Sequence, residues 1–223
     1  MQDISVFDVI GPIMVGPSSS HTAGADRIGL LAGKLLKGRI AKAEFVLYGS
    51  FARTAEGHGT KRALLGGVLG FPPEDVRIRD SYEYARQQGV EYRFTENFEE
   101  TDLHPNTADL TLTDESGKVL KVRGKSVGGG KVVIENINGI KVDFTGNYST
   151  ILVEQRDAPG VLNFITRVLS ARKINIAFMR LYRESKGNKA YTIIEADEKI
   201  PEAVVTDIES HSEIKSATLL EVE

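Results

Sequence analysis

The sequence predicts an α/β (α+β) fold with two domains, an α/β domain over residues 1–146 and a ferredoxin-like βαββαβ domain over residues 147–223. Three observations lead to this prediction. Helical and strand periodicities alternate in the first part of the chain, two hairpin signatures follow before residue 145, and strand and helix patterns after Gly146 come in the order βαββαβ. A length of 223 residues suits one large domain or two small ones.

The composition is that of a folded globular protein and argues against several functions. Hydrophobic residues make up 41% and charged residues 26%, and the formal net charge of −3 lacks the basic excess that binds nucleic acid. Because there is no cysteine, the chain has no thiolates for an iron–sulfur cluster or a Cys-type zinc site. No apolar stretch reaches the roughly 20 residues that span a bilayer, and Met1–Ile10 is unlike a leader peptide, so we expect a cytoplasmic protein.

The first elements read as helix, strand, helix. Apolar residues recur at helical spacing after a run of N-cap residues and predict a helix near 21–37. The segment 43–48 reads as a strand. A second helix is expected over 53–69, ending before the glycine and prolines at 70–73.

Two hairpins are predicted next, each from alternating runs that flank a turn signal. The first pairs 108–113 with 118–123, and the second pairs 131–136 with 140–144 around Asn138-Gly139. They bracket a glycine-rich segment at 124–130, which we expect to curve closely around another part of the structure.

The pattern after Gly146 is that of a ferredoxin-like unit, and we place the domain boundary at 146–148. Strands and helices alternate with short turns in the order βαββαβ. The expected elements are a strand at 149–155, a helix at 160–172, strands at 174–183 and 189–196, a helix after Pro201 and a strand at 214–222.

The segment Gly16–Thr22 (GPSSSHT) is the most informative part of the chain. Ser18, Ser19 and Ser20 meet the unpaired N–H groups of a helix start beside His21, and such a place binds a carboxylate or phosphate well. Simple helix capping is the alternative, but capping needs only one serine. The segment alone leaves both interpretations open.

A second candidate is the segment 57–60 (GHGT), in which His58 stands between two glycines early in the expected helix. Each glycine costs a helix about 1 kcal/mol relative to alanine, so a function is expected to offset that cost. An imidazole titrates where it can take and return a proton. The alternative is a capped helix start with an exposed histidine.

The remaining polar motifs carry less information. His104-Pro105-Asn106 has turn composition, which is common in loops, and His211 is expected to be structural at a helix end. Gly124-Lys125-Ser126 lacks the first glycine of a P-loop, and Gly57-His58-Gly59 lacks the third glycine of a dinucleotide-binding fingerprint. No histidine pair has the i, i+4 spacing of an HExxH zinc site, so we expect no metal site made by this chain alone.

Taken together, these motifs resemble the beta chain of the bacterial iron–sulfur-dependent L-serine dehydratases over essentially the whole length. The resemblance rests on five segments of the first domain and on the C-terminal unit, which is similar to an ACT domain with Asp157-Ala158-Pro159-Gly160-Val161. The five segments are FDVIGP at 7–12, GPSSSHT at 16–22, GHGT at 57–60, HPN at 104–106 and SVGGG at 126–130.

This resemblance implies a two-chain lyase that converts L-serine to pyruvate and ammonia and is inactive without its alpha chain. The alpha chain would hold a [4Fe-4S] cluster whose open iron acts on the serine hydroxyl, which fits the absence of cysteine here. His58 would be the first candidate for proton transfer and His21 the second. The residues expected to bind substrate or orient the histidines are Ser18, Ser19, Ser20, Thr60, His104, Asn106, Gly128 and Gly129.

The resemblance also implies regulation. The first domain would be of the allosteric-substrate-binding type shared with some phosphoglycerate dehydrogenases. In ACT units an amino acid binds at a dimer interface, here at Asp157, Gly160 and Asn175, although such a unit can also serve only for self-association. The alternative to an enzyme subunit is a non-catalytic, amino-acid-sensing regulatory or assembly module.

Overall fold

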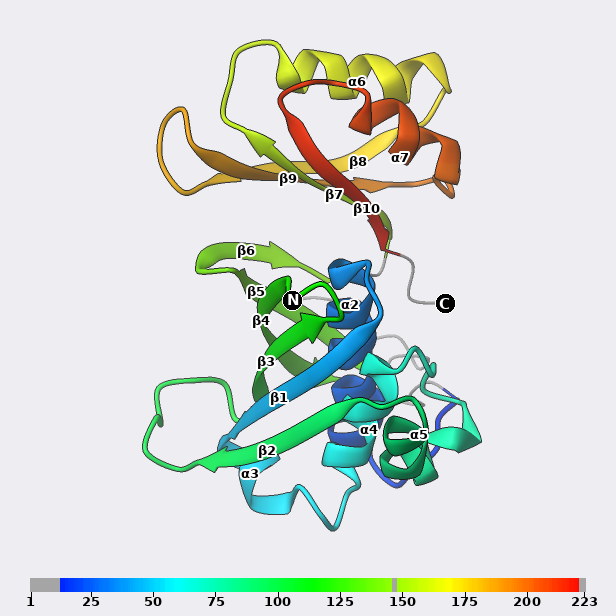
Figure 1. Ribbon diagram of the computed structural model, residues 1–223, viewed down its shortest axis with the longest axis vertical. Coiled ribbons are helices and arrows are strands. Elements are labelled where there is room, and N and C mark those ends of the chain that lie inside the picture. The colour runs from blue at the N-terminus through cyan, green and yellow to red at the C-terminus, as the bar shows by residue number, and fades with distance from the viewer. Residues whose placement is uncertain (1–12, 146–147, 221–223) are drawn as a thin grey trace, which may run out of the picture. The chain divides into compact units, whose positions relative to one another are not determined.

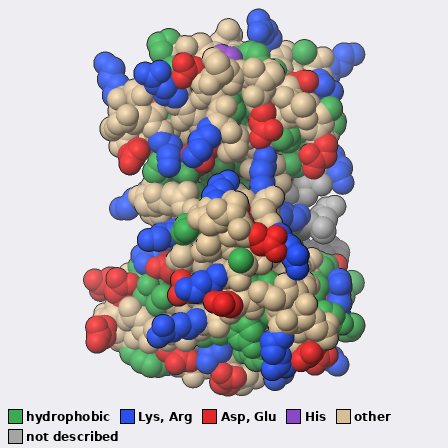
Figure 2. Space-filling model, viewed as in Figure 1, with side chains coloured by type: hydrophobic (Ala, Val, Ile, Leu, Met, Phe, Trp, Pro, Cys, Tyr) green, Lys and Arg blue, Asp and Glu red, His purple; other side chains and the backbone are tan. Residues whose placement is uncertain are grey.

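The computed structural model describes residues 13–145 and 148–220. The chain forms two compact units, and the division falls between Gly139 and Ile140. The predicted boundary at 146–148 lies largely on residues 146–147, outside the described residues. Acidic and basic side chains are interspersed over the face drawn in Figure 2, and neither gathers into a large continuous area there.

The first sheet has the strand order β2-β1-β3-β4-β5-β6 (Figure 1). β1 runs parallel to β2, whereas the pairings β1–β3, β3–β4 and β4–β5 are antiparallel. The strands are β1 (Ile40–Tyr48), β2 (Glu91–Asn97), β3 (Thr107–Asp114), β4 (Val119–Gly128), β5 (Lys131–Ile137) and β6 (Ile140–Phe144). The predicted strand at 43–48 and both predicted hairpins are therefore present.

The helices of the first unit begin with a single π-turn, η1 (Ser19–Ala23), which leads directly into α2 (Gly24–Leu36). The others are α3 (Gly49–Thr54), α4 (Thr60–Val68), the 3₁₀ turn η2 (Val76–Asp80) and α5 (Ser81–Gln87). The expected helix at 21–37 is present, whereas η2, α5 and β2 were not predicted from the sequence.

α2 lies against the sheet and beside α4 (Figure 1). Glycines make this close approach possible, because a Cβ on Gly67 would lie 2.0 Å from the carbonyl oxygen of Asp26 and a Cβ on Gly124 would lie 2.8 Å from Ile28. The glycine-rich segment after residue 123 therefore passes close to α2. It then turns at Gly128–Gly130, where all three residues have positive φ.

The prediction of one continuous helix over 53–69 is wrong. α3 ends at Thr54, residues 55–59 form a turn, and α4 begins at Thr60. Gly59 has φ +69°, a left-handed conformation that glycine adopts without the steric cost paid by other residues. Gly59 is thus the N-cap of α4, and both glycines lie in the turn between two helices and not near the start of a single helix.

The second unit is a four-stranded antiparallel sheet in the order β10-β7-β9-β8, with α6 and α7 on one face (Figure 1). This order confirms the predicted ferredoxin-like βαββαβ fold. Its core joins β7 residues such as Ile151 and Val153 to Val161, Ile165 and Leu169 of α6. The elements are β7 (Ser149–Arg156), α6 (Val161–Ala171), β8 (Ile176–Arg183), β9 (Lys189–Ala196), α7 (Glu202–Glu209) and β10 (Ile214–Leu220).

Candidate active site

The serine run forms the start of the η1 turn. The hydroxyl of Ser18 accepts a hydrogen bond from the backbone N–H of His21 at 3.1 Å, so Ser18 is the N-cap. The hydroxyl of Ser20 lies 3.0 Å from Nδ1 of His21. Helix capping, the alternative interpretation of this segment, therefore accounts for Ser18. Ser20 instead contacts the imidazole of His21.

Both ring nitrogens of His21 have hydroxyl partners. Ser20 lies at Nδ1, and the Oγ of Ser50, at the start of α3, lies 2.8 Å from Nε2. The edge of the ring meets Phe51 at a centroid distance of 5.4 Å. Partial burial, followed by the proximity of His58, lowers the pKa of His21, so the neutral imidazole is favoured.

His58 lies in the turn between α3 and α4, with its ring centroid 5.0 Å from that of His21. Thr22 donates a hydrogen bond of 2.9 Å to the backbone carbonyl of His58 and so fixes the turn to η1. Nδ1 of His58 is buried and has no hydrogen-bond partner among the described residues. The structure thus brings the two predicted histidines together but leaves only one of them with an uncommitted nitrogen.

Two buried hydroxyls belong to the motifs that contain or face these histidines. Thr60 and Ser126 are both 0% exposed, and neither hydroxyl has a hydrogen-bond partner within residues 13–145 and 148–220. Ser126 packs against the start of α2, where a Cβ on Gly24 would lie 2.1 Å from its Oγ. Buried hydroxyls in proteins are usually hydrogen-bonded, so unpaired ones mark candidate ligand contacts.

The backbone carbonyls of the HPN turn hold two neighbouring segments of the candidate site in place. The carbonyl of Pro105 accepts hydrogen bonds from the N–H groups of Ser50 and Phe51, at 2.7 and 3.1 Å, and the carbonyl of Asn106 accepts one from Ser126 at 2.9 Å. The ring of His104 is exposed, and its Nδ1 accepts a local bond from the N–H of Asn106. Oδ1 of Asn106 is buried without a partner among the described residues.

Gly128 and Gly129 lie at the β4–β5 turn, with φ +100° and +59°. The turn is tied to α2, because Nη1 of Arg27 donates to the carbonyl of Gly130 at 3.0 Å. The four motifs at 16–22, 57–60, 104–106 and 126–130 are thus joined through η1, α2 and α3, while a contact of Gly128 or Gly129 with substrate stays a prediction.

Ser50 is the site residue that the sequence analysis missed. It also lines a pocket of about 230 Å³. The other lining residues are Gly49, Arg53, Asn97, Phe98, Glu100, Thr101, Leu103 and Pro105. The available signal was a Gly-Ser pair directly after a strand, which alone is common in turns.

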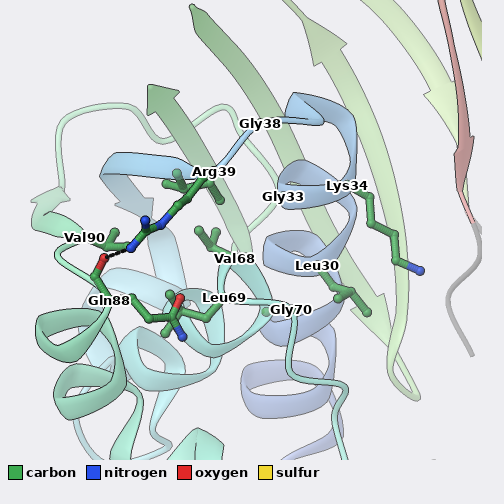
Figure 3. A pocket seen from close by; sticks show the side chains of 12 residues that line it. Leu30, Gly33, Lys34, Gly38, Arg39, Val68, Leu69, Gly70, Gln88 and Val90 are labelled. Carbon is green, nitrogen blue, oxygen red and sulfur yellow. Dashed lines mark hydrogen bonds between the residues drawn. The ribbon is translucent and has the colours of Figure 1, made fainter. Parts of the chain in front are cut away.

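A second pocket of the first unit, of about 320 Å³, lies at the opposite ends of α2 and α4 (Figure 3). Glycines and aliphatic residues such as Leu30, Gly33 and Val68 line it, and Arg39 donates across its rim to the carbonyl of Gln88 at 3.1 Å. It holds none of the predicted site residues.

In the second unit, two of the three predicted ligand residues are engaged with neighbouring side chains. Oδ2 of Asp157 accepts from the N–H of Gly187 and from Arg183, and these two donors lower the pKa of the Asp157 carboxyl. Nδ2 of Asn175 donates to Asp197 at 2.6 Å. Gly160 has φ +91° with open space around it, and ligand binding at these residues stays a prediction.

The donor atoms of this chain do not suit an iron–sulfur cluster. The sequence supplies no thiolate, and the described residues contain no group of three or more His, Asp and Glu side chains that would hold a metal ion. Both ring nitrogens of His21 have hydroxyl partners, and His58 lies beside it with an unpaired Nδ1, so the two histidines do not belong to a metal ligand set among the described residues.

A family model for the serine dehydratase beta chain matches residues 5–137, and an ACT domain model matches residues 149–213. The chain belongs to the serine dehydratase beta chain family. This confirms the resemblance drawn from the motifs, and every site segment described in the first unit lies within the matched range.

Two proteins named as L-serine dehydratase beta chains are similar to this chain over all or most of its length. The chain is 41% identical to the L-serine dehydratase beta chain of Peptoniphilus asaccharolyticus, with all of both chains covered, and 40% identical to a probable L-serine dehydratase beta chain of Bacillus subtilis over 92% of each. A D-3-phosphoglycerate dehydrogenase of B. subtilis is 24% identical over 89% of this chain and 37% of its own length.

Among the residues that the structure describes, every helix is too short or too polar to span a bilayer.

Proposed function

We propose that this chain is the beta subunit of an L-serine dehydratase, which converts L-serine to pyruvate and ammonia together with a separate alpha chain in the cytoplasm. The full-length similarity to proteins named as such beta chains supports the proposal. The observation that carries it at the site is the pairing of His21 and His58, with rings 5.0 Å apart and an uncommitted Nδ1 on His58.

His58 is the group that removes the α-proton of serine. Because both nitrogens of His21 already have hydroxyl partners, His58 is the histidine whose ring has an unpaired buried nitrogen. An imidazole side chain is suited to accept a proton and return it. The α-proton and the β-hydroxyl leave serine as water, and the resulting aminoacrylate tautomerises to an imine that water hydrolyses to pyruvate and ammonia.

His21 and the hydroxyls hold the substrate and the base in place. The lowered pKa of His21 keeps it neutral, so it orients its neighbours without adding a positive charge beside His58. The unpaired buried hydroxyls of Thr60 and Ser126 and the amide oxygen of Asn106 are available to substrate polar groups. Ser18, Ser19 and Ser20 complete the polar surface around the η1 turn, while Gly128, Gly129 and His104 are proposed contacts nearby.

The [4Fe-4S] cluster belongs to the alpha chain in this proposal, since this chain offers it no thiolate. Residues 1–146 would form the catalytic half-site and residues 147–223 the ACT domain, which associates with a second copy and binds an amino acid at Asp157, Gly160 and Asn175. The sensing-module alternative accounts less well for two histidines held side by side, and the names of the similar beta chains do not favour it.

The direct test is anaerobic co-expression with the candidate alpha chain, followed by cluster reconstitution and a pyruvate assay with L-serine. We expect pyruvate from the two-chain complex and none from this chain alone, which should be purified colourless and free of iron. A complex with full iron content that makes no pyruvate would refute the proposed reaction. Cluster absorbance in the isolated chain would refute the division of labour.

A further inference from the structure

Ser50 contacts one of the two histidines although it lies outside every motif that carries the family resemblance. Its Oγ is 2.8 Å from Nε2 of His21, across 29 positions of sequence. On the opposite side of the ring, the Oγ of Ser20 is 3.0 Å from Nδ1. The imidazole of His21 is therefore held between two hydroxyls that come from different elements, η1 and α3.

The position of Ser50 is itself fixed by the backbone of the HPN turn. The N–H groups of Ser50 and Phe51 both donate to the carbonyl of Pro105. Gly49 allows the close approach, because it has φ +50° and a Cβ there would lie 2.7 Å from Cα of Pro105. The backbone at Ser50 is thus fixed by two hydrogen bonds, and only the χ1 rotation of its short side chain remains to bring the hydroxyl to His21.

Two hydroxyls suit a neutral imidazole. Such a ring has one N–H donor and one acceptor nitrogen, and a serine hydroxyl can complement either because it both donates and accepts. Burial and His58 already favour the neutral form of His21. Removing one hydroxyl leaves one ring nitrogen without its partner, and the ring is then free to rotate or to exchange tautomers.

We propose that Ser50 is a positioning residue that holds the imidazole of His21 in one orientation and one tautomer beside His58. It acts through His21, and the HPN turn acts through Ser50 by way of the Pro105 carbonyl. This proposal deepens the proposed function and rests on it for the kinetic part of its test, whereas the spectroscopic part needs only the isolated chain.

The kinetic test compares three variants in the two-chain enzyme. Ser50→Ala should lower kcat by about 10- to 100-fold with little change in KM, because a misplaced catalytic group slows the step without weakening substrate binding. Ser50→Thr keeps the hydroxyl and should recover most of that loss. Thr54→Val is the matched control, because Thr54 donates its hydroxyl to the carbonyl of Ser50 on the same helix and does not contact His21.

The spectroscopic test measures the ¹⁵N shifts of the two ring nitrogens of His21 in the isolated chain, with the signals assigned by their loss in His21→Gln. We expect these shifts to change in Ser50→Ala, to return toward the parent values in Ser50→Thr and to stay unchanged in Thr54→Val.

Unchanged His21 shifts in Ser50→Ala would overturn the proposal whatever the parent complex does with L-serine. In an active complex it would also be overturned by an unchanged kcat, by a raised KM at constant kcat, or by equal losses in Ser50→Ala and Thr54→Val. An inactive parent complex would instead count against the proposed function, and the shifts alone would then decide the role of Ser50.

Discussion

The hydroxyl of Thr22 donates a hydrogen bond of 2.9 Å to the backbone carbonyl of His58. Thr22 directly follows His21 in the η1 turn, so one bond joins the two segments that carry the paired histidines. Thr22 is only 3% exposed, and such a bond is stronger there than it would be in water. The spacing of the two rings therefore depends on a residue that contributes no imidazole.

We predict that Thr22→Val destabilises the fold by about 1 kcal/mol, the usual net contribution of a hydrogen bond, and lowers kcat in the two-chain enzyme. Valine keeps the shape of threonine but removes the donor, so the 55–59 turn loses its tie to η1. Thr22→Ser keeps the donor and should remain nearer the parent in both properties. Denaturant unfolding and the pyruvate assay measure the two effects. A Thr22→Val variant with parental stability and kcat would show that the bond does not hold the turn.

We predict that the buried carboxyl of Asp26 makes the stability of the fold depend on pH in an unusual direction. It is 0% exposed, neither carboxylate oxygen has a partner among the described residues, and burial, followed by the charge of Glu74, raises its pKa well above the usual value. The folded state therefore holds this proton more tightly than the unfolded state does. The contribution of Asp26 to stability is greatest below the unfolded pKa and is lost as pH rises.

Asp26→Asn, which cannot ionise, should accordingly raise Tm at pH 7.5, and the gain should shrink as pH falls toward 4. Asp114→Asn is the matched control, because its effect on Tm should depend on pH in the opposite direction. Ser116 lowers the pKa of Asp114, so that carboxylate stabilises the fold above its unfolded pKa and the stabilisation is lost as pH falls. Thermal unfolding across pH measures both. A Tm difference for Asp26→Asn that does not vary with pH would contradict a buried, titrating carboxyl.

The second unit should associate with a second copy of itself, because about 75 residues with one helix-covered sheet face leave little core. We predict that the full chain sediments as a dimer and that L-serine binding gives heat in calorimetric titration. Gly160→Val and Asn175→Ala should each weaken L-serine binding without dissociating the dimer. A dimer with no heat would leave only the assembly role, and a monomer at tens of micromolar would contradict both roles.

The sequence predicted most of the fold because strong local signals specify it. The ferredoxin-like unit follows from strand and helix periods separated by turns such as Asp157–Gly160, and Asn138-Gly139 marks a hairpin by its turn chemistry. The prediction of one helix over 53–69 was wrong because two glycines were read as tolerated inside a helix. The left-handed conformation of Gly59, which separates α3 from α4, is seen only in the folded chain.

Part of the candidate site was also predicted, because local sequence signals mark it. Serines and histidines grouped in short motifs can be recognised locally, and the structure brings His21 and His58 together. Ser50 could not be recognised, because its importance arises from a contact with a residue 29 positions away and from a backbone bond to Pro105. The second ring nitrogen of His21 thus acquires its partner only when the chain folds.

The most direct test of this account is kcat for L-serine in the two-chain enzyme with His58→Ala, measured beside the parent and His211→Ala at matched iron content. His58→Ala should lower kcat by about 10²-fold or more, the usual contribution of a general base, while the complex still assembles. His211 lies in the second unit beside Phe164 and should be replaceable with little effect. Parental kcat in His58→Ala, with or without a raised KM, would contradict the assignment of His58 as the residue that takes the proton from serine.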